Sequence, residues 1–258
     1  ARGTLYYGIA SLPEPEYIFQ FHPEYQQYGH DYADHVYKDF KENTLYVEVG
    51  KNLLFLFFEN FVADPARVPH PSEVMHYPVI FAGFLSLVFT FLNLLPIGQL
   101  DGGHVSYGLF GFKTHRIIAT VIFIALLIYA GIGVVSPSDD RNDLMIKIPL
   151  ALLYLYIALS GLGLSERNRF MYMFLIFACV FLISGAFPTL EGYQPWLLFG
   201  LIIGRLIGIQ HPPSEIEEPL DTKRIVLGWI ALIIFVICFA PAPLIADLII
   251  VEPTGAAQ

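Results

Sequence analysis

The feature that most constrains the fold is the run from Asn93 to His104, NLLPIGQLDGGH, which ends a stretch apolar enough to cross a bilayer. It places a proline, three glycines and the Asp101 carboxylate where a continuous helix would otherwise run. An ionised side chain at lipid depth costs roughly 3 kcal/mol or more. Backbone groups freed by Pro96 also need cover from protein or from a water-filled cavity. The run therefore predicts a buried, locally unwound polar site.

The composition places the chain among integral membrane proteins. Hydrophobic residues make up 55% of the 258 residues and charged residues only 14%, outside the range of an ordinary soluble domain. The net charge of −9 and the lack of a basic stripe exclude a nucleic-acid partner. Cys179 and Cys238 lie inside apolar runs, which predicts neither a disulfide framework nor a thiolate metal site.

We expect an all-α polytopic membrane protein with about six membrane segments and a small extracytoplasmic insertion, α/β or irregular, near the N-terminus. Residues 1–10 resemble the end of a truncated membrane helix, 11–77 an acidic insertion, 78–251 the helix bundle and 252–258 a tail. Alternation from Leu45 to Val49 predicts a short strand within the insertion. The predicted spans are 78–95, 117–135, 146–164, 170–190, 196–209 and 225–251.

Two of these spans are irregular. The fifth is short and carries Arg205, which favours a tilted or re-entrant segment. In the last span, Pro241 and Pro243 each lack a backbone donor, so we expect them to kink the helix or to end its regular part early.

Basic residues in the short loops predict the orientation. One side of the bundle collects Lys113, Arg116, Arg167, Arg169, Lys223 and Arg224. The opposite side has Arg141 and Lys147 among aspartates. By the positive-inside rule the first side is cytoplasmic. We therefore predict a multi-pass protein of a bacterial inner membrane, with the Asp101 turn toward the cytoplasm and membrane lipid around the bundle.

Several roles are open to a lone membrane aspartate: proton carrier, counter-ion to an arginine, cation ligand, zinc ligand, or cap of the helix that follows. Pro96 and Gly98 prevent a continuous helix between Asn93 and Asp101, so an amide and a carboxylate can converge on one pocket. Gly102 and Gly103 would let the backbone approach a ligand closely. His104 either hydrogen-bonds Asp101 or satisfies a buried turn.

Asn93-Leu-Leu-Pro96 followed by Leu100-Asp101-Gly102-Gly103-His104 resembles the N-x-x-P-x-x-x-L-D-G motif of the site-2 protease family, the intramembrane zinc metalloproteases of peptidase family M50. The form is similar to a bacterial and chloroplast branch that includes the ethylene-dependent gravitropism proteins. The resemblance implies that Asp101 is a Zn²⁺ ligand and that Asn93 is the catalytic polar residue that places the substrate backbone or the oxyanion. Pro96, Gly98, Gly102, Gly103 and His104 would shape the site.

In that family two further zinc ligands come from an H-E-x-x-H helix, and its glutamate activates the zinc-bound water. No H-E-x-x-H occurs in the 258 residues. In the family this helix precedes the segment that corresponds to residues 1–10. We therefore expect the C-terminal membrane portion of a protease of transmembrane protein substrates, which holds one ligand of three and is inactive alone.

Two other hypotheses come from different classes. An inactive relative would serve as a membrane scaffold or as a subunit of a larger membrane complex. A secondary transporter would use Asp101 as its coupling carboxylate, but the span pattern shows no internal repeat. We interpret the insertion's histidines as ordinary polar residues; they are His22, His30, His35, His70 and His76.

Overall fold

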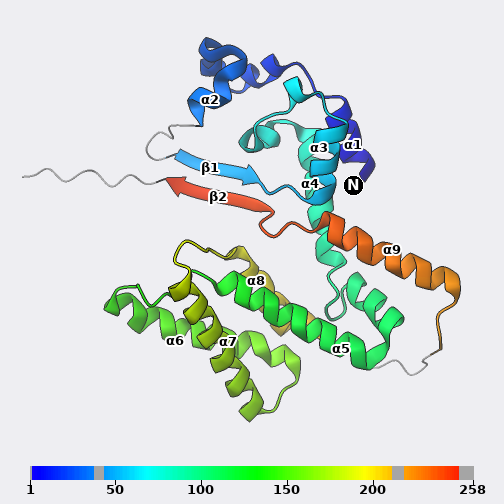
Figure 1. Cartoon of the computed structure of the whole chain (residues 1–258), viewed down its shortest axis with the longest axis vertical. Helices are drawn as coiled ribbons and strands as arrows, with labels where there is room; N and C mark the ends of the chain where they lie inside the picture. Colours follow the sequence, from blue (N-terminus) through cyan, green and yellow to red (C-terminus); the bar gives the residue numbers. More distant parts are fainter. Residues whose placement is uncertain (1, 38–43, 211–217, 250–258) are drawn as a thin grey trace, which may run out of the picture. The chain divides into compact units, whose positions relative to one another are not determined.

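The structure is a computed structural model that describes residues 2–37, 44–210 and 218–249. The chain divides into two compact units, Ala1–Leu92 with Val236–Gln258, and Asn93–Phe235. Helices make up most of both units (Figure 1).

The helices of the first unit are short and several begin at a proline. Its α-helices are α1 (Arg2–Ala10), α2 (Tyr32–Val36), α3 (Leu53–Phe61) and α4 (Pro78–Asn93). Its 3-10 helices are η1 (Pro15–Gln20), η2 (Pro23–Asp31), η3 (Pro65–Arg67) and η4 (Pro71–His76). Proline suits the first helical position because the amide proton that it lacks has no intrahelical acceptor there. The insertion is thus a succession of tight turns.

Helices α1 and α4 pack closely because glycine lies at their crossing. A Cβ on Gly83 of α4 would lie 2.7 Å from the Leu5 Cα of α1. A Cβ on Gly8 of α1 would lie 3.0 Å from the Ile80 Cγ1 of α4. Small residues at such a crossing let helix backbones approach, as is common in membrane bundles.

The predicted strand is confirmed as β1 (Thr44–Val49), which pairs antiparallel with β2 (Leu244–Ile249). The pairing corrects the last predicted span. Helix α9 (Thr222–Cys238) ends before Pro241 and Pro243, as expected from the two prolines, but the mainly apolar residues 244–249 then form a strand rather than more helix. At the end of the pair, the Gly50 amide donates to the Pro243 carbonyl at 2.8 Å.

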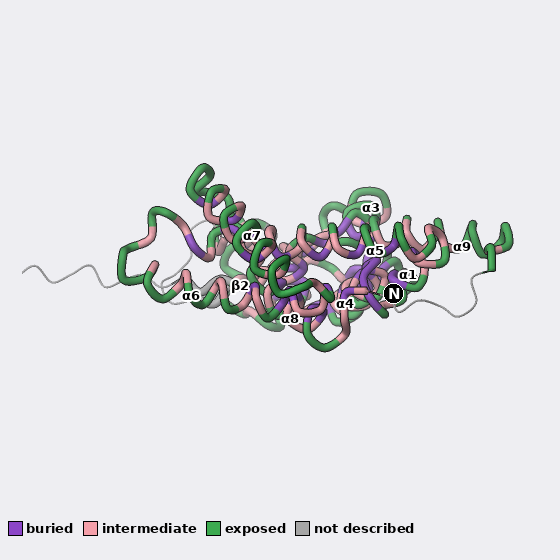
Figure 2. The backbone as a smooth tube through the Cα atoms, turned by 90° about the horizontal axis from the view of Figure 1, so that it is seen from below, coloured by how far each residue is buried: buried purple, intermediate pink, exposed green. Residues whose placement is uncertain are grey.

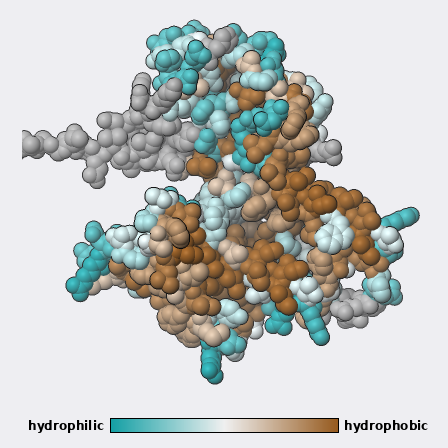
Figure 3. Space-filling model, in the orientation of Figure 1, coloured by the Kyte–Doolittle hydropathy of each residue, from teal (hydrophilic) through white to brown (hydrophobic). Residues whose placement is uncertain are grey.

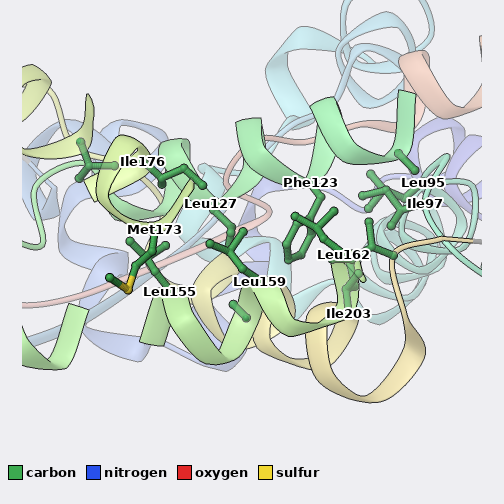
Figure 4. Packing of buried hydrophobic residues seen from close by; sticks show 14 residues of the cluster. Leu95, Ile97, Phe123, Leu127, Leu155, Leu159, Leu162, Met173, Ile176 and Ile203 are labelled. Carbon is green, nitrogen blue, oxygen red and sulfur yellow. The ribbon is translucent and has the colours of Figure 1, made fainter. Parts of the chain in front are cut away.

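The second unit is a packed group of helices. They are α5 (Asp101–Gly131), α6 (Arg141–Ala158), η5 (Leu159–Leu162), α7 (Glu166–Ala186), α8 (Pro195–Ile202), the π-helical turn η6 (Ile203–Ile207) and most of α9. Phe123 and Leu127 of α5 lie at the centre of its core, against residues of α6, η5, α7 and η6 (Figure 4). Leu95 and Ile97, from the unwound run before α5, belong to the same core. The turn that carries Asp101 is therefore anchored in the bundle.

Among the residues that the structure describes, three helices are long and apolar enough to cross a membrane: Asp101–Gly131, Arg141–Leu162 and Glu166–Ala186. They cover three of the predicted spans, and Pro78–Asn93 and Pro195–Ile207 are shorter apolar helices. Many large apolar side chains on these helices are exposed, and Figure 3 shows hydrophobic surface over much of the helices. Within α9 only Cys238 is buried, and Figure 2 shows this helix mostly in the colours of exposed and intermediate residues. Such surfaces suit a lipid environment. Six crossings, the extracytoplasmic side of the insertion and the domain boundaries stay predictions.

The sheet register gives a test of the corrected C-terminal segment. Val47 lies opposite Ala246, and directly opposed Cα atoms in an antiparallel pair are about 4.5–5.5 Å apart, within the reach of a disulfide. In a chain with Cys179 and Cys238 replaced by Ala, Val47→Cys with Ala246→Cys should cross-link under mild oxidation, as mass spectrometry of peptides will show. Val47→Cys with Ile245→Cys should not, because adjacent strand residues face opposite sides. Equal cross-linking of both pairs, or of neither, would refute this register.

Candidate functional site

The backbone between α4 and α5 is unwound from residue 94 to residue 100, as the sequence predicts. Its tight turns are closed by local hydrogen bonds, from the Ile97 amide to the Leu95 carbonyl at 2.7 Å and from the Leu100 amide to the Ile97 carbonyl at 3.3 Å. The Gly98 amide donates to the Ile209 carbonyl at 2.9 Å, which joins this run to the segment after η6. The freed backbone groups are thus partly satisfied within the protein, as lipid depth requires.

The predicted site-shaping glycines each lie against backbone. Gly98 has a φ of +56°, and a Cβ there would lie 2.0 Å from the Gly208 carbonyl oxygen. A Cβ on Gly102 would lie 1.9 Å from the Leu94 oxygen, and one on Gly103 would lie 2.2 Å from the Gly98 oxygen. Any side chain at these three positions would collide with a carbonyl. Together with the buried Pro96 they let the unwound run fold back onto the first turn of α5.

Asp101 is the first residue of α5 and its side chain is exposed. The residue before it, Leu100, is the N-cap and gives the helix no side-chain cap. A carboxylate in the first helical turn is favoured by the helix dipole, which accounts for part of its placement. Within the described residues the carboxylate has neither a hydrogen bond nor an ion pair, so no arginine of the described chain holds it as a counter-ion.

Asn93 and His104 lie at the two ends of the turn. Asn93 is the last residue of α4 and is exposed, so the turn separates it from Asp101 at the start of the next helix. His104 is also exposed, so the interpretation that it satisfies a buried turn is wrong. Its amide continues α5 by donating to the Leu100 carbonyl at 3.1 Å. The side chains of Asn93, Asp101 and His104 are therefore all exposed, and the described residues do not enclose them.

A buried pair that the sequence analysis missed lies behind the turn. Helix α5 breaks at Gly111, where φ is +75°, and this break brings together Ser106 and His115, both fully buried. The Ser106 hydroxyl donates to the Gly103 carbonyl at 3.0 Å and lies 2.6 Å from His115 Nδ1. Residues nine apart in an unbroken helix would lie about 13 Å apart along its axis, so only the break allows this contact. The pair ties the half-helix that begins at Asp101 to the half that carries the core.

The collision at Gly102 predicts a specific loss of stability. In Gly102→Ala the new methyl group would overlap the Leu94 carbonyl, so the turn must shift. We expect the thermal midpoint in detergent to fall. Gly108→Ala is the matched control, since it lies in the same half-helix with only the Leu220 side chain nearby, at 3.4 Å. Replacing glycine by alanine inside a helix otherwise stabilises the protein by about 0.5–1 kcal/mol, so Gly108→Ala should not lower the midpoint. Equal midpoints for the two variants would contradict this packing.

Comparisons with known proteins bear on this site directly. A model of Peptidase family M50 matches residues 51–135, which include the whole Asp101 turn. The chain is 35% identical over 108 residues to the "Probable zinc metallopeptidase EGY3, chloroplastic" of Arabidopsis thaliana, an alignment that covers 38% of this chain and 18% of the relative. It is 43% identical over 106 residues to the "Probable zinc metalloprotease EGY3, chloroplastic" of Oryza sativa subsp. indica, an alignment that covers 33% of this chain and 17% of the relative.

The aligned region thus spans less than one fifth of either relative. No solved structure matches the chain. The helices and the site define the class of protein: a membrane-associated chain with apolar helices and an unwound turn that carries an aspartate. Within that class, the family match and the named relatives support placement in peptidase family M50, a family of intramembrane proteases. The resemblance predicted from the Asp101 turn is confirmed.

Proposed function

We propose that this chain is the C-terminal membrane portion of an intramembrane zinc metalloprotease that hydrolyses peptide bonds of membrane-embedded substrates, with Asp101 as one zinc ligand. The observation that carries the proposal is the exposed Asp101 carboxylate at the start of α5, which no described residue pairs with. The turn that presents it carries the family's motif and lies inside the matched region. Packed glycine backbone fixes this turn, and binding sites need such rigid support.

The donor set tests the fit of zinc. Catalytic zinc sites use three protein ligands, chosen among imidazole, carboxylate and thiolate, and keep a fourth position open. Asp101 can supply one of these three ligands, since its carboxylate is accessible and pairs with no cationic side chain of the described residues. The 258 residues contain no H-E-x-x-H, and we propose that the other two ligands come from residues outside them. We propose that the residues present are inactive by themselves.

The chain's own residues act by positioning. Zinc, when bound, lowers the pKa of its water to about 7 and so supplies a nucleophile at neutral pH. Asp101 is held on one side of the unwound run by the first turn of α5 and by the Ser106–His115 pair behind it. Asn93, on the other side of the run, carries an amide that can donate to the substrate carbonyl. Donors preorganised at that oxygen stabilise the negative charge that develops on it.

The proposed partners follow from the surface. Exposed apolar side chains on α5, α6 and α7 would contact membrane lipid and the helix of a transmembrane substrate. The aromatic insertion would control access of the substrate, and other membrane subunits would be further partners. We retain the predicted cytoplasmic orientation of the turn as part of the proposal. The predicted location in a bacterial inner membrane is not part of the proposal, because the named relatives are chloroplastic.

Zinc content tests the ligand. In the purified full-length gene product, Asp101→Ala should lower bound zinc by one equivalent and abolish cleavage of a transmembrane substrate, because one of three ligands is lost. Asp143→Ala is the matched control, an exposed aspartate in the first turn of another membrane helix. It should change neither quantity. Unchanged zinc in Asp101→Ala would reject Asp101 as a ligand.

Kinetics test the role of Asn93. Loss of one oxyanion donor typically lowers kcat by about 10²–10³. We therefore expect Asn93→Ala to lower kcat of the full-length protease by that order, with KM nearly unchanged and a full zinc content. A change confined to KM would assign Asn93 to substrate binding instead, and an unchanged kcat and KM would remove it from the site.

The absence of H-E-x-x-H from these residues also favours a second candidate, an inactive relative that serves as a membrane scaffold or subunit of a larger complex. Two results together would support it. The full-length gene product would lack the two histidines, and the chain would co-purify stoichiometrically with other membrane proteins. A zinc-dependent peptidase activity would exclude it.

A further inference from the structure

A second group of potential metal ligands lies in the insertion, among residues of the first unit. His22 is the N-cap of η2, and Glu73 and His76 lie three apart on η4. One ligand atom from each residue lies within 4.8 Å of the other two. The Glu73 Oε2 is the common point, 2.7 Å from His76 Nδ1 and 3.7 Å from His22 Nε2. Two imidazoles and one carboxylate therefore converge from segments about fifty residues apart in the sequence.

Glu73 is 2% exposed, and a buried carboxylate is costly unless it is paired. The Tyr37 hydroxyl donates to its Oε1, which leaves Oε2 directed at the two imidazoles. In the described chain, the basic groups within 4 Å of Oε2 are these two imidazoles.

His22 has the arrangement expected of a metal-binding imidazole. Its Nδ1 lies 3.3 Å from the Glu24 carboxylate, so Nδ1 can donate a proton to Glu24 and leave the lone pair of Nε2, 3.7 Å from the Glu73 oxygen, for an ion. Histidine ligands of metals almost always donate their second nitrogen to such a carboxylate or carbonyl, which fixes the tautomer and the ring.

Aromatic rings hold both imidazoles in place. Tyr25 stacks on His22 with ring centroids 4.5 Å apart and an interplanar angle of 10°. Phe21 packs on His76 with centroids 4.7 Å apart. The two imidazole rings meet edge to face at 5.0 Å. These contacts restrict both rings before any ion binds, which reduces the entropy lost on binding.

We propose that His22, Glu73 and His76 bind a divalent transition metal ion, and that zinc fits this donor set best. Zinc takes imidazole and carboxylate ligands at about 2.0–2.2 Å, which places tetrahedral ligand atoms about 3.3 Å apart. The two measured separations of 2.7 and 3.7 Å lie on either side of that value. All three ligand atoms lie within 4.8 Å of one another, so side-chain rotations would bring them to the ion. The ion would tie His22 to η4 and brace the insertion, independently of the Asp101 site.

The test uses the full chain in detergent with Asp101→Ala, so that the proposed catalytic ligand contributes nothing. After removal of metal with a chelator and titration with zinc, this protein should bind one equivalent. With cobalt it should give a tetrahedral visible spectrum without a thiolate charge-transfer band. Added Glu73→Gln or His76→Asn should weaken zinc binding at least 100-fold. Glu24→Gln should weaken it about 10- to 100-fold, as is typical of a lost partner of a ligand.

His70→Asn is the matched control. His70 is half-buried, stacks on Tyr37 and caps η4 by accepting from the Ser72 amide. Asparagine preserves such a cap, so this variant should keep full zinc affinity. Absence of zinc binding in the Asp101→Ala protein would overturn the proposal in favour of a metal-free ion pair between histidine and Glu73. Undiminished binding in Glu73→Gln would overturn it too. If near-ultraviolet circular dichroism shows that Glu73→Gln fails to fold, the cobalt spectrum and Glu24→Gln decide.

Discussion

The close packing of backbone on backbone at the Asp101 turn is the constraint on which the site depends. Gly98, Gly102 and Gly103 each lie where a Cβ would be about 2 Å from a carbonyl oxygen. Real Cβ atoms essentially never approach so closely, so only glycine allows the unwound run to pack against the first turn of α5 and against Gly208. Asp101 directly precedes two of these glycines and is exposed at the start of the helix.

The same turn is part of the hydrophobic core of its unit. Leu95 and Ile97 are buried with Phe123 and with Ile203 of η6. The Gly98 amide and the Ile209 carbonyl add a hydrogen bond to the segment after η6. Behind the turn, Ser106 and His115 link the two halves of α5. Such a framework fixes the backbone that carries the Asp101 carboxylate, and this suits a metal ligand, whose position must be held within about 0.5 Å.

Much of this could be predicted from local sequence. Pro96 and the glycines predicted the break between helices, alternation predicted β1, and Pro241 and Pro243 predicted the early end of α9. Nothing local could show that residues 244–249 pair with β1, because an apolar run reads alike as a span and as a strand. Ser106 and His115 escaped notice since only the positive φ of Gly111 brings them together. His22 and His76 were interpreted as ordinary polar residues because their shared partner, Glu73, is distant from His22 in sequence.

The central claim is that Asp101 completes a zinc site with two ligands from residues outside these 258. Anomalous diffraction at the zinc absorption edge from crystals of the full-length gene product tests it most directly. The account predicts a zinc peak about 2.0–2.2 Å from an Asp101 carboxylate oxygen, with two further protein ligands contributed by residues not in this chain. A zinc-loaded protein whose peaks all lie away from Asp101 would contradict it.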